Sequence, residues 1–66
     1  MKVTVNGVVK EVADGASVQG LLEALGLSKG RVAVELNREI IVRDAYAGAA
    51  LKEGDVLEIL SFVGGG

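Results

Sequence analysis

Apolar and polar residues alternate along the first twelve positions of the chain. From Met1 to Val5 an apolar side chain stands at every second position, the period-two pattern of a half-buried strand. Asn6-Gly7 follows, and both residues tolerate the positive φ that a type I′ turn requires. The chain then returns as a second strand over Val8–Val12. The first twelve residues therefore predict a β-hairpin.

The spacing becomes helical after Asp14-Gly15, where the alternation breaks. Apolar side chains recur at positions i, i+3, i+4 and i+7, the stripe of an amphipathic helix: Val18, Leu21, Leu22 and Leu25. Ser17 is placed to cap this helix by accepting a hydrogen bond from a free backbone N–H. Gly26 is suited to the left-handed conformation that commonly follows a helix. We predict one short helix between Ser17 and Gly26.

The second half of the chain predicts a second hairpin, a short helical turn and a last strand. These segments are a strand over Val32–Leu36, a turn at Asn37-Arg38, a brief strand over Glu39–Val42, a helical turn followed by coil within Arg43–Ala50, a turn at Gly54-Asp55 and a strand over Val56–Phe62. The whole order is two strands, a helix, two strands, a helical turn and a strand.

This order predicts an α+β domain in which a mixed five-stranded sheet packs on one helix. The first and last strands can lie side by side and parallel in the middle of the sheet, because a helix and many residues separate them. That arrangement is the ubiquitin-like β-grasp architecture, which puts the C-terminus at the end of a central strand. We expect a single domain over residues 1–63 and a flexible glycine tail over residues 64–66.

The last predicted strand has one charged residue that sets the direction of its side chains. Alternation places Glu58 on the opposite face from Leu57 and Ile59. If Glu58 faces solvent, Leu57 and Ile59 belong to the core, and Leu60 and Phe62 share the outward face of Glu58.

Outward apolar side chains beside a chain end suggest a partner-docking patch, and aromatic residues are enriched at such interfaces. We therefore predict that Leu60 and Phe62 dock a partner protein. The alternative is that a neighbouring loop, including Tyr46 and the alanines after it, partly covers both side chains and uses them for packing.

Composition narrows the chemistry that the chain can perform. Half of its 66 residues are apolar, enough for one small core, and it contains no Cys and no His. Disulfides, the usual zinc site and a thiol or imidazole nucleophile are thereby excluded. A net charge of −2 with interspersed signs argues against nucleic-acid binding, and no apolar run approaches the length of a membrane span. We expect a soluble cytoplasmic protein with no nucleic-acid partner, no membrane association and no metal site.

The charged and turn residues of this sequence have ordinary structural explanations. The carboxylates are scattered along the chain, so we expect solvated faces and no catalytic pair: Glu11, Glu23, Glu35, Glu39, Glu53 and Glu58. Asn37 suits a turn because it tolerates left-handed φ. Arg43 either solvates a loop or pairs with Asp44 or Glu39, and Gly54-Asp55 serves a turn.

The chain as printed ends in Gly64, Gly65 and Gly66. Glycine loses more conformational freedom on ordering than any other residue, so three in a row finish a folded strand poorly. One explanation is a frayed end, since disorder concentrates at termini. The other is a thin segment that threads a narrow channel, because each missing Cβ removes a clash.

The segment AVELNREIIVRDAYAGAALKEGDVLEILSFVGGG, in a β-grasp chain of this length, resembles the ThiS-type sulfur carriers of bacterial thiamin biosynthesis. The likeness covers the whole chain and is densest at the Leu36-Asn37 turn, Arg43, Gly54-Asp55 and the final glycines. The resemblance implies that the Gly66 carboxylate is adenylated and converted to a thiocarboxylate, with Gly64 and Gly65 as the threading segment. The carrier would then be a co-substrate that has no catalytic residue.

The same resemblance implies the partners and the cofactors. A ubiquitin-activator-like enzyme would adenylate the tail with ATP and Mg²⁺, a persulfide enzyme would supply sulfur, and thiazole synthase would receive it. The carrier itself would bind no cofactor.

Three other functions stay open on the sequence alone. A molybdopterin synthase small subunit shares the tail and the fold, although its chain is usually longer. A ubiquitin-like protein modifier would attach the activated tail to lysines. A non-covalent β-grasp binding module would need no free diglycine end, and it would be expected to show a basic face.

Overall fold

The computed structural model describes residues 1–62, which form five strands, one α-helix and one 3-10 helix. The elements are β1 (Lys2–Val5), β2 (Val8–Glu11), α1 (Val18–Ala24), β3 (Arg31–Leu36), β4 (Glu39–Ile41), η1 (Arg43–Ala45) and β5 (Val56–Phe62). Every predicted element is present, and the predicted bounds of the last strand match those of β5. The short helical turn expected within Arg43–Ala50 is η1.

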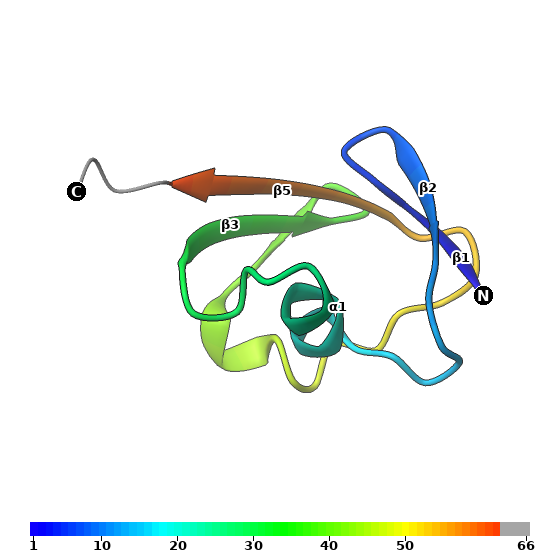
Figure 1. Ribbon diagram of the computed structural model, residues 1–66, viewed down its shortest axis with the longest axis horizontal. Coiled ribbons are helices and arrows are strands. Elements are labelled where there is room, and N and C mark those ends of the chain that lie inside the picture. The colour runs from blue at the N-terminus through cyan, green and yellow to red at the C-terminus, as the bar shows by residue number, and fades with distance from the viewer. Residues whose placement is uncertain (63–66) are drawn as a thin grey trace.

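The five strands make one mixed sheet in the order β2-β1-β5-β3-β4. Strands β1 and β5 are parallel, and the other neighbours are antiparallel. Helix α1 covers one face of this sheet (Figure 1). The prediction of a β-grasp fold with the first and last strands side by side is confirmed. Strand β5 is consequently central, and its C-terminal end lies at the opposite end of the molecule from the N-terminus.

Two tight turns set the register of the hairpins. Asn6 and Gly7 have φ values of 49° and 82°, and Asn37 and Arg38 have 50° and 72°. Consecutive positive φ values define the type I′ geometry, whose twist matches that of the flanking strands. Arg38 adopts this conformation although it has a Cβ, which costs roughly 1–2 kcal/mol relative to right-handed backbone.

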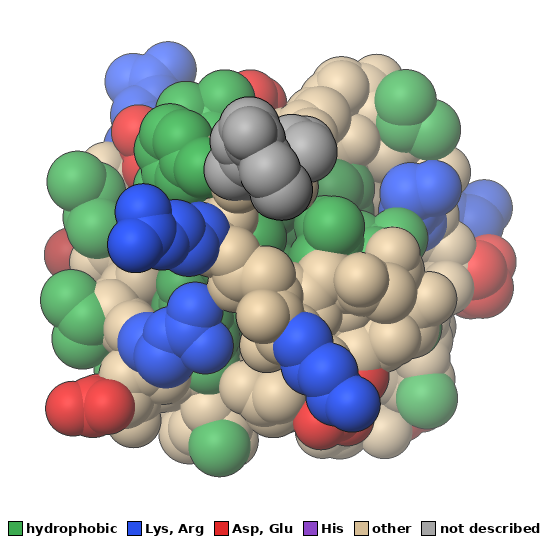
Figure 2. All heavy atoms as spheres, turned by 60° about the vertical axis from the view of Figure 1, so that its left-hand side comes forward, with side chains coloured by type: hydrophobic (Ala, Val, Ile, Leu, Met, Phe, Trp, Pro, Cys, Tyr) green, Lys and Arg blue, Asp and Glu red, His purple; other side chains and the backbone are tan. Residues whose placement is uncertain are grey.

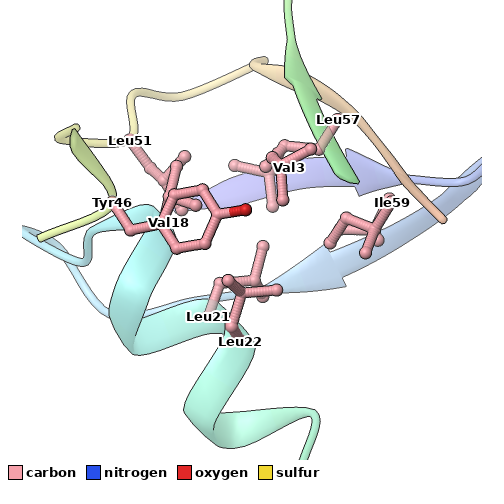
Figure 3. Packing of buried hydrophobic residues seen from close by; sticks show 10 residues of the cluster. Val3, Val18, Leu21, Leu22, Tyr46, Leu51, Leu57 and Ile59 are labelled. Atoms are coloured by element: carbon pink, nitrogen blue, oxygen red, sulfur yellow. The ribbon is translucent and has the colours of Figure 1, made fainter. Parts of the chain in front are cut away.

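The core lies between α1 and the covered face of the sheet (Figure 3). Its ten fully buried side chains are Val3, Val5, Val18, Leu21, Leu22, Val34, Tyr46, Leu51, Leu57 and Ile59. The predicted helix stripe supplies three of these, and Leu25, its fourth member, is partly buried. The predicted cap is also confirmed, because the Ser17 hydroxyl oxygen accepts a hydrogen bond from the Gly20 amide at 3.1 Å.

The Asn6 side chain extends the pairing between β1 and β5 past the point where β1 turns away. The Asn6 backbone N–H donates to the Leu57 carbonyl at 2.9 Å. Its side-chain Nδ2 then donates to the Ile59 carbonyl at 3.0 Å, and its Oδ1 accepts from the Ile59 amide at 2.7 Å. The amide side chain thus stands in for a backbone partner one step further along β5.

Asn37 extends the pairing between β3 and β5 in the same way, at the other edge of β5. Its backbone N–H donates to the Val56 carbonyl at 2.8 Å, and its Oδ1 accepts from the Val56 amide at 2.9 Å. Its Nδ2 donates to the buried carboxylate of Asp55 at 3.0 Å, and that carboxylate also accepts from the Lys52 amide at 2.7 Å. The expected turn roles of Asn37 and Gly54-Asp55 are confirmed, and both turns are tied to the start of β5.

We expect Asn6→Gly to lower the free energy of unfolding by about 1–3 kcal/mol, because the Ile59 amide and carbonyl lose their partners. Glycine keeps the positive φ, so the loss reports the side-chain hydrogen bonds together with a smaller backbone entropy term. Asn6→Asp keeps an acceptor for the Ile59 amide, so its free energy of unfolding should lie between those of the parent and Asn6→Gly. Urea unfolding followed by circular dichroism measures all three proteins. Equal stability of Asn6→Gly and the parent would show that this side chain contributes nothing.

Candidate functional site

The outward side chains at the C-terminal end of β5 form the first part of the site. Leu60 and Phe62 are 64% and 55% exposed, whereas Leu57 and Ile59 are 0% and 5% exposed. Glu58 is exposed on the same side as Leu60 and Phe62. The predicted alternation of β5 is therefore confirmed, and the two predicted docking residues lie on the sheet face that α1 does not cover.

The alternative of a loop packed over Leu60 and Phe62 is wrong. Tyr46 is 4% exposed and belongs to the core. It lies in the buried cluster on the helix side of the sheet (Figure 3). Hydrophobic burial draws the ring into the interior, so it leaves the outer face of β5 open.

The neighbouring strands continue this outer face. Ala33 on β3 lies directly opposite Leu60, and Ile40 on β4 lies opposite Glu35. Ile40 is 76% exposed. An open hollow of about 260 Å³ lies over these strands, and its lining residues are Ala33, Val34, Glu35, Ile40, Glu58 and Leu60. The sequence-based reasoning missed Ile40, although alternation within the fourth strand would have placed it opposite to Ile41.

Two acidic residues are neighbours on this face. Glu35 and Glu58 are direct cross-strand partners of β3 and β5. Both also line a second hollow of about 490 Å³, together with Asn37, Arg38 and Val56. Like charges placed directly opposite each other in a sheet are destabilising. Both residues are exposed, as expected, and the sequence analysis did not identify their cross-strand pairing.

The predicted covalent and threading residues lie outside the described residues. These are Gly66, Gly65 and Gly64, and the expected domain boundary at residue 63 lies there too. The structure describes the strand that precedes them, β5. Phe62, its last residue, pairs with Arg31 at the start of β3.

Arg43 anchors a loop at the same end of the sheet. Its Nη2 donates to the Gly30 carbonyl at 3.0 Å. Of the two roles considered for Arg43, the structure favours the one in a loop, because within residues 1–62 Arg43 forms no ion pair with Asp44 or Glu39. The carbonyl of the turn before β3 is simply the nearer acceptor in space.

The described part of the chain contains no cluster of three or more acidic side chains that could hold a metal ion. Nor does any helix within residues 1–62 combine the length and apolar character that a bilayer crossing requires.

The sequence model of the ThiS family matches residues 3–66. The chain belongs to the ThiS family. The sulfur carrier protein ThiS of Bacillus subtilis is 43% identical over 58 residues, which are 88% of each chain. The crystal structure of a ThiS thiamine biosynthesis protein from Geobacter metallireducens has a TM-score of 0.83 at 42% identity and covers 100% of both chains. The resemblance noted in the sequence is confirmed, and so is the β-grasp fold.

Longer proteins contain a similar segment. The thiazole synthases of Paramagnetospirillum magneticum and Magnetococcus marinus are 42% and 38% identical to this chain over 66 residues. The chain spans only 20% of the length of either protein. In these two relatives, most of the polypeptide therefore lies outside the match.

We expect Leu60→Asp and Phe62→Asp to weaken binding at least tenfold, a change of about 1.4 kcal/mol, to the two partners that the resemblance implies, an adenylating enzyme and thiazole synthase. Both side chains are exposed, so the loss of unfolding free energy should stay near 1 kcal/mol, the range of strand propensities. Isothermal titration calorimetry and thermal melting give the two quantities.

Val9→Asp is the matched control for these variants. Val9 lies on β2 and is 63% exposed, close to the exposure of Leu60. Binding by Val9→Asp should match that of the parent. If Val9→Asp and Leu60→Asp weaken binding equally, the docking patch is not where we place it. Unfolding of Leu60→Asp at ordinary temperature would contradict the exposed position.

Proposed function

We propose that this chain is a sulfur carrier for thiamin thiazole synthesis, and that it carries the sulfur as a thiocarboxylate on Gly66. The observation that supports this most is the extent of the family match, which runs over residues 3–66 and so includes all three final glycines. The similarity to the Bacillus subtilis sulfur carrier supports the same function.

The proposed chemistry begins by making the carboxylate electrophilic. A free carboxylate reacts poorly because oxide or hydroxide would have to leave. Transfer of AMP from ATP releases pyrophosphate and gives a mixed anhydride whose leaving group is AMP. An enzyme persulfide attacks the Gly66 carbonyl carbon and expels AMP, which forms an acyl disulfide. A second thiol then attacks the sulfur that is bonded to the enzyme. The S–S bond breaks, a disulfide forms on the enzyme side, and the Gly66 thiocarboxylate is released.

In this proposal the chain is a co-substrate, and ATP and Mg²⁺ act in the adenylating partner. Four extended residues after Phe62 would reach at most about 13–14 Å from the folded body. Glycine side chains let such a segment enter an enclosed site, and an unhindered carbonyl suits the geometry that nucleophilic attack needs. The use of ATP and thiols is consistent with the cytoplasm as the setting.

The proposed recipient of the sulfur is thiazole synthase. Two proteins of that name contain a segment similar to this whole chain. A carrier and its recipient that share one polypeptide in relatives are expected to act together when they are separate proteins. The involvement of an adenylating enzyme and of a persulfide donor is proposed from the reaction steps described above.

The test is intact mass spectrometry of a protein that ends at Gly66, incubated with the adenylating enzyme, ATP, Mg²⁺ and a persulfide donor. We expect the mass to rise by the difference between one sulfur and one oxygen atom, and fragmentation should place the change on Gly66. Addition of thiazole synthase and its other substrates should restore the original mass. An unchanged mass in a system that modifies the Bacillus subtilis carrier would contradict the proposal. Attachment to lysines of other proteins would instead favour a protein modifier.

Two variants separate the tail chemistry from the fold. Deletion of Gly66, or Gly65→Val, should abolish the mass change because the reacting group is lost or the Cβ clashes in the channel. Neither should shift the melting temperature by more than about 2 °C, if the tail adds little to stability. A large fall in melting temperature would show that the tail is part of the packed structure.

A further inference from the structure

Three basic side chains gather at the end of the sheet where β5 finishes. Lys29, Arg31 and Arg43 are all exposed, and we call them the tail-side basic cluster. On the end of the molecule that comes forward in Figure 2, several Lys and Arg side chains lie next to hydrophobic ones. Fourteen positions separate the first of them from the last in the sequence, and the sequence analysis noted only that charges of both signs are interspersed.

Strand pairing and one hydrogen bond bring the cluster together. Arg31 is the direct cross-strand partner of Phe62, so its side chain leaves the sheet on the same face as the predicted docking patch. Arg43 is held beside the loop before β3 through its hydrogen bond to the Gly30 carbonyl. Lys29 precedes Gly30 in that loop.

Three of the nine acidic residues lie at the other end of the molecule. Glu11 and Asp14 are each 3.4 Å from the Met1 ammonium group, and the Glu53 carboxylate accepts from the Lys2 amide at 2.9 Å. These carboxylates therefore surround the N-terminal end of the molecule, opposite to the end of β5 (Figure 1). Asp44 adjoins Arg43 in sequence and reduces the charge of the cluster without cancelling it. In a chain of net charge −2, the end that leads to the tail is locally positive.

We propose that the tail-side basic cluster binds an acidic protein surface around the opening through which the adenylating partner admits the tail. This inference rests on the proposed function, since it assumes that the tail enters a partner. Charge complementarity supports this inference. The cations lie beside Phe62, where the tail begins, so they would face the residues that border the opening, and acidic side chains there would pair with them. Complementary charge also steers association and fixes the orientation of docking.

The phosphates of ATP are a less suitable match for these cations. In the proposed reaction the adenylate forms on Gly66, four residues beyond Phe62. An extended segment of that length spans about 13–14 Å, which is far longer than a lysine or arginine side chain. The cluster therefore faces the rim of the opening, while the nucleotide lies deeper.

The test compares charge reversals at the two ends of the molecule. The variants Lys29→Glu, Arg31→Glu and the pair together are matched with Lys52→Glu, which makes the same change in an exposed loop at the N-terminal end. Arg43 stays unchanged because it holds the loop. Stopped-flow fluorescence of a labelled carrier measures its association rate with the adenylating enzyme, at low and at high salt.

We expect the paired variant to associate about tenfold more slowly at low salt, within the range that electrostatic steering covers. The difference from the parent should shrink at high salt, where exposed charges are screened. Lys52→Glu should stay within about twofold of the parent, as expected of a charge outside the interface.

Equal rates for the paired variant and Lys52→Glu would overturn the inference. A raised KM for ATP with an unchanged association rate would also overturn it, because the cations would then contact the nucleotide. Association does not require sulfur transfer. A parent protein that associates but never gains sulfur would therefore contradict only the proposed function. The effect of the charge reversals on the association rate could still be measured. If the parent does not associate at all, both proposals are wrong.

Discussion

The parallel pairing of β1 with β5 is the interaction on which the rest of the structure depends. It places the last strand in the middle of the sheet, between β1 and β3. Asn6 from one hairpin turn and Asn37 from the other add side-chain hydrogen bonds to the backbone of β5. These contacts hold β5 along both edges as far as Ile59, and from there to Phe62 the strand pairs with β3.

Alternation along β5 gives the strand one buried side and one exposed side. Leu57 and Ile59 face α1 and complete the core, whereas Leu60 and Phe62 face outward. The outer face also has a charge order along the strand, from the Glu35 and Glu58 carboxylates to the basic side chain of Arg31 beside Phe62. A surface that changes from acidic through apolar to basic over one strand has a direction. A partner whose facing surface runs from basic through apolar to acidic would bind this face in one orientation. It would then receive the tail at its acidic end.

Local patterns in the sequence predicted the elements, the turns and the two faces of β5, because alternation and turn propensities act over a few residues. They could not show contacts that depend on how distant strands align. Asn6 bonds to Ile59 across 53 positions, and Glu35 meets Glu58 only through the β3–β5 register. The positive φ of Arg38 also escaped notice, since the turn geometry overrides its own preference. The glycine tail was read from composition and from the family resemblance, and it lies outside the described residues.

The central claim is that partners bind the outer face of the sheet at the end of β5. Titration of the ¹⁵N-labelled chain with the adenylating enzyme, followed by amide NMR, tests this claim most directly. Signals of Ala33, Leu60 and Phe62 should broaden or shift first, while Glu23 and Ala24 on the exposed side of α1 stay unchanged. Changes centred on Glu23 and Ala24, with β5 unaffected, would contradict it.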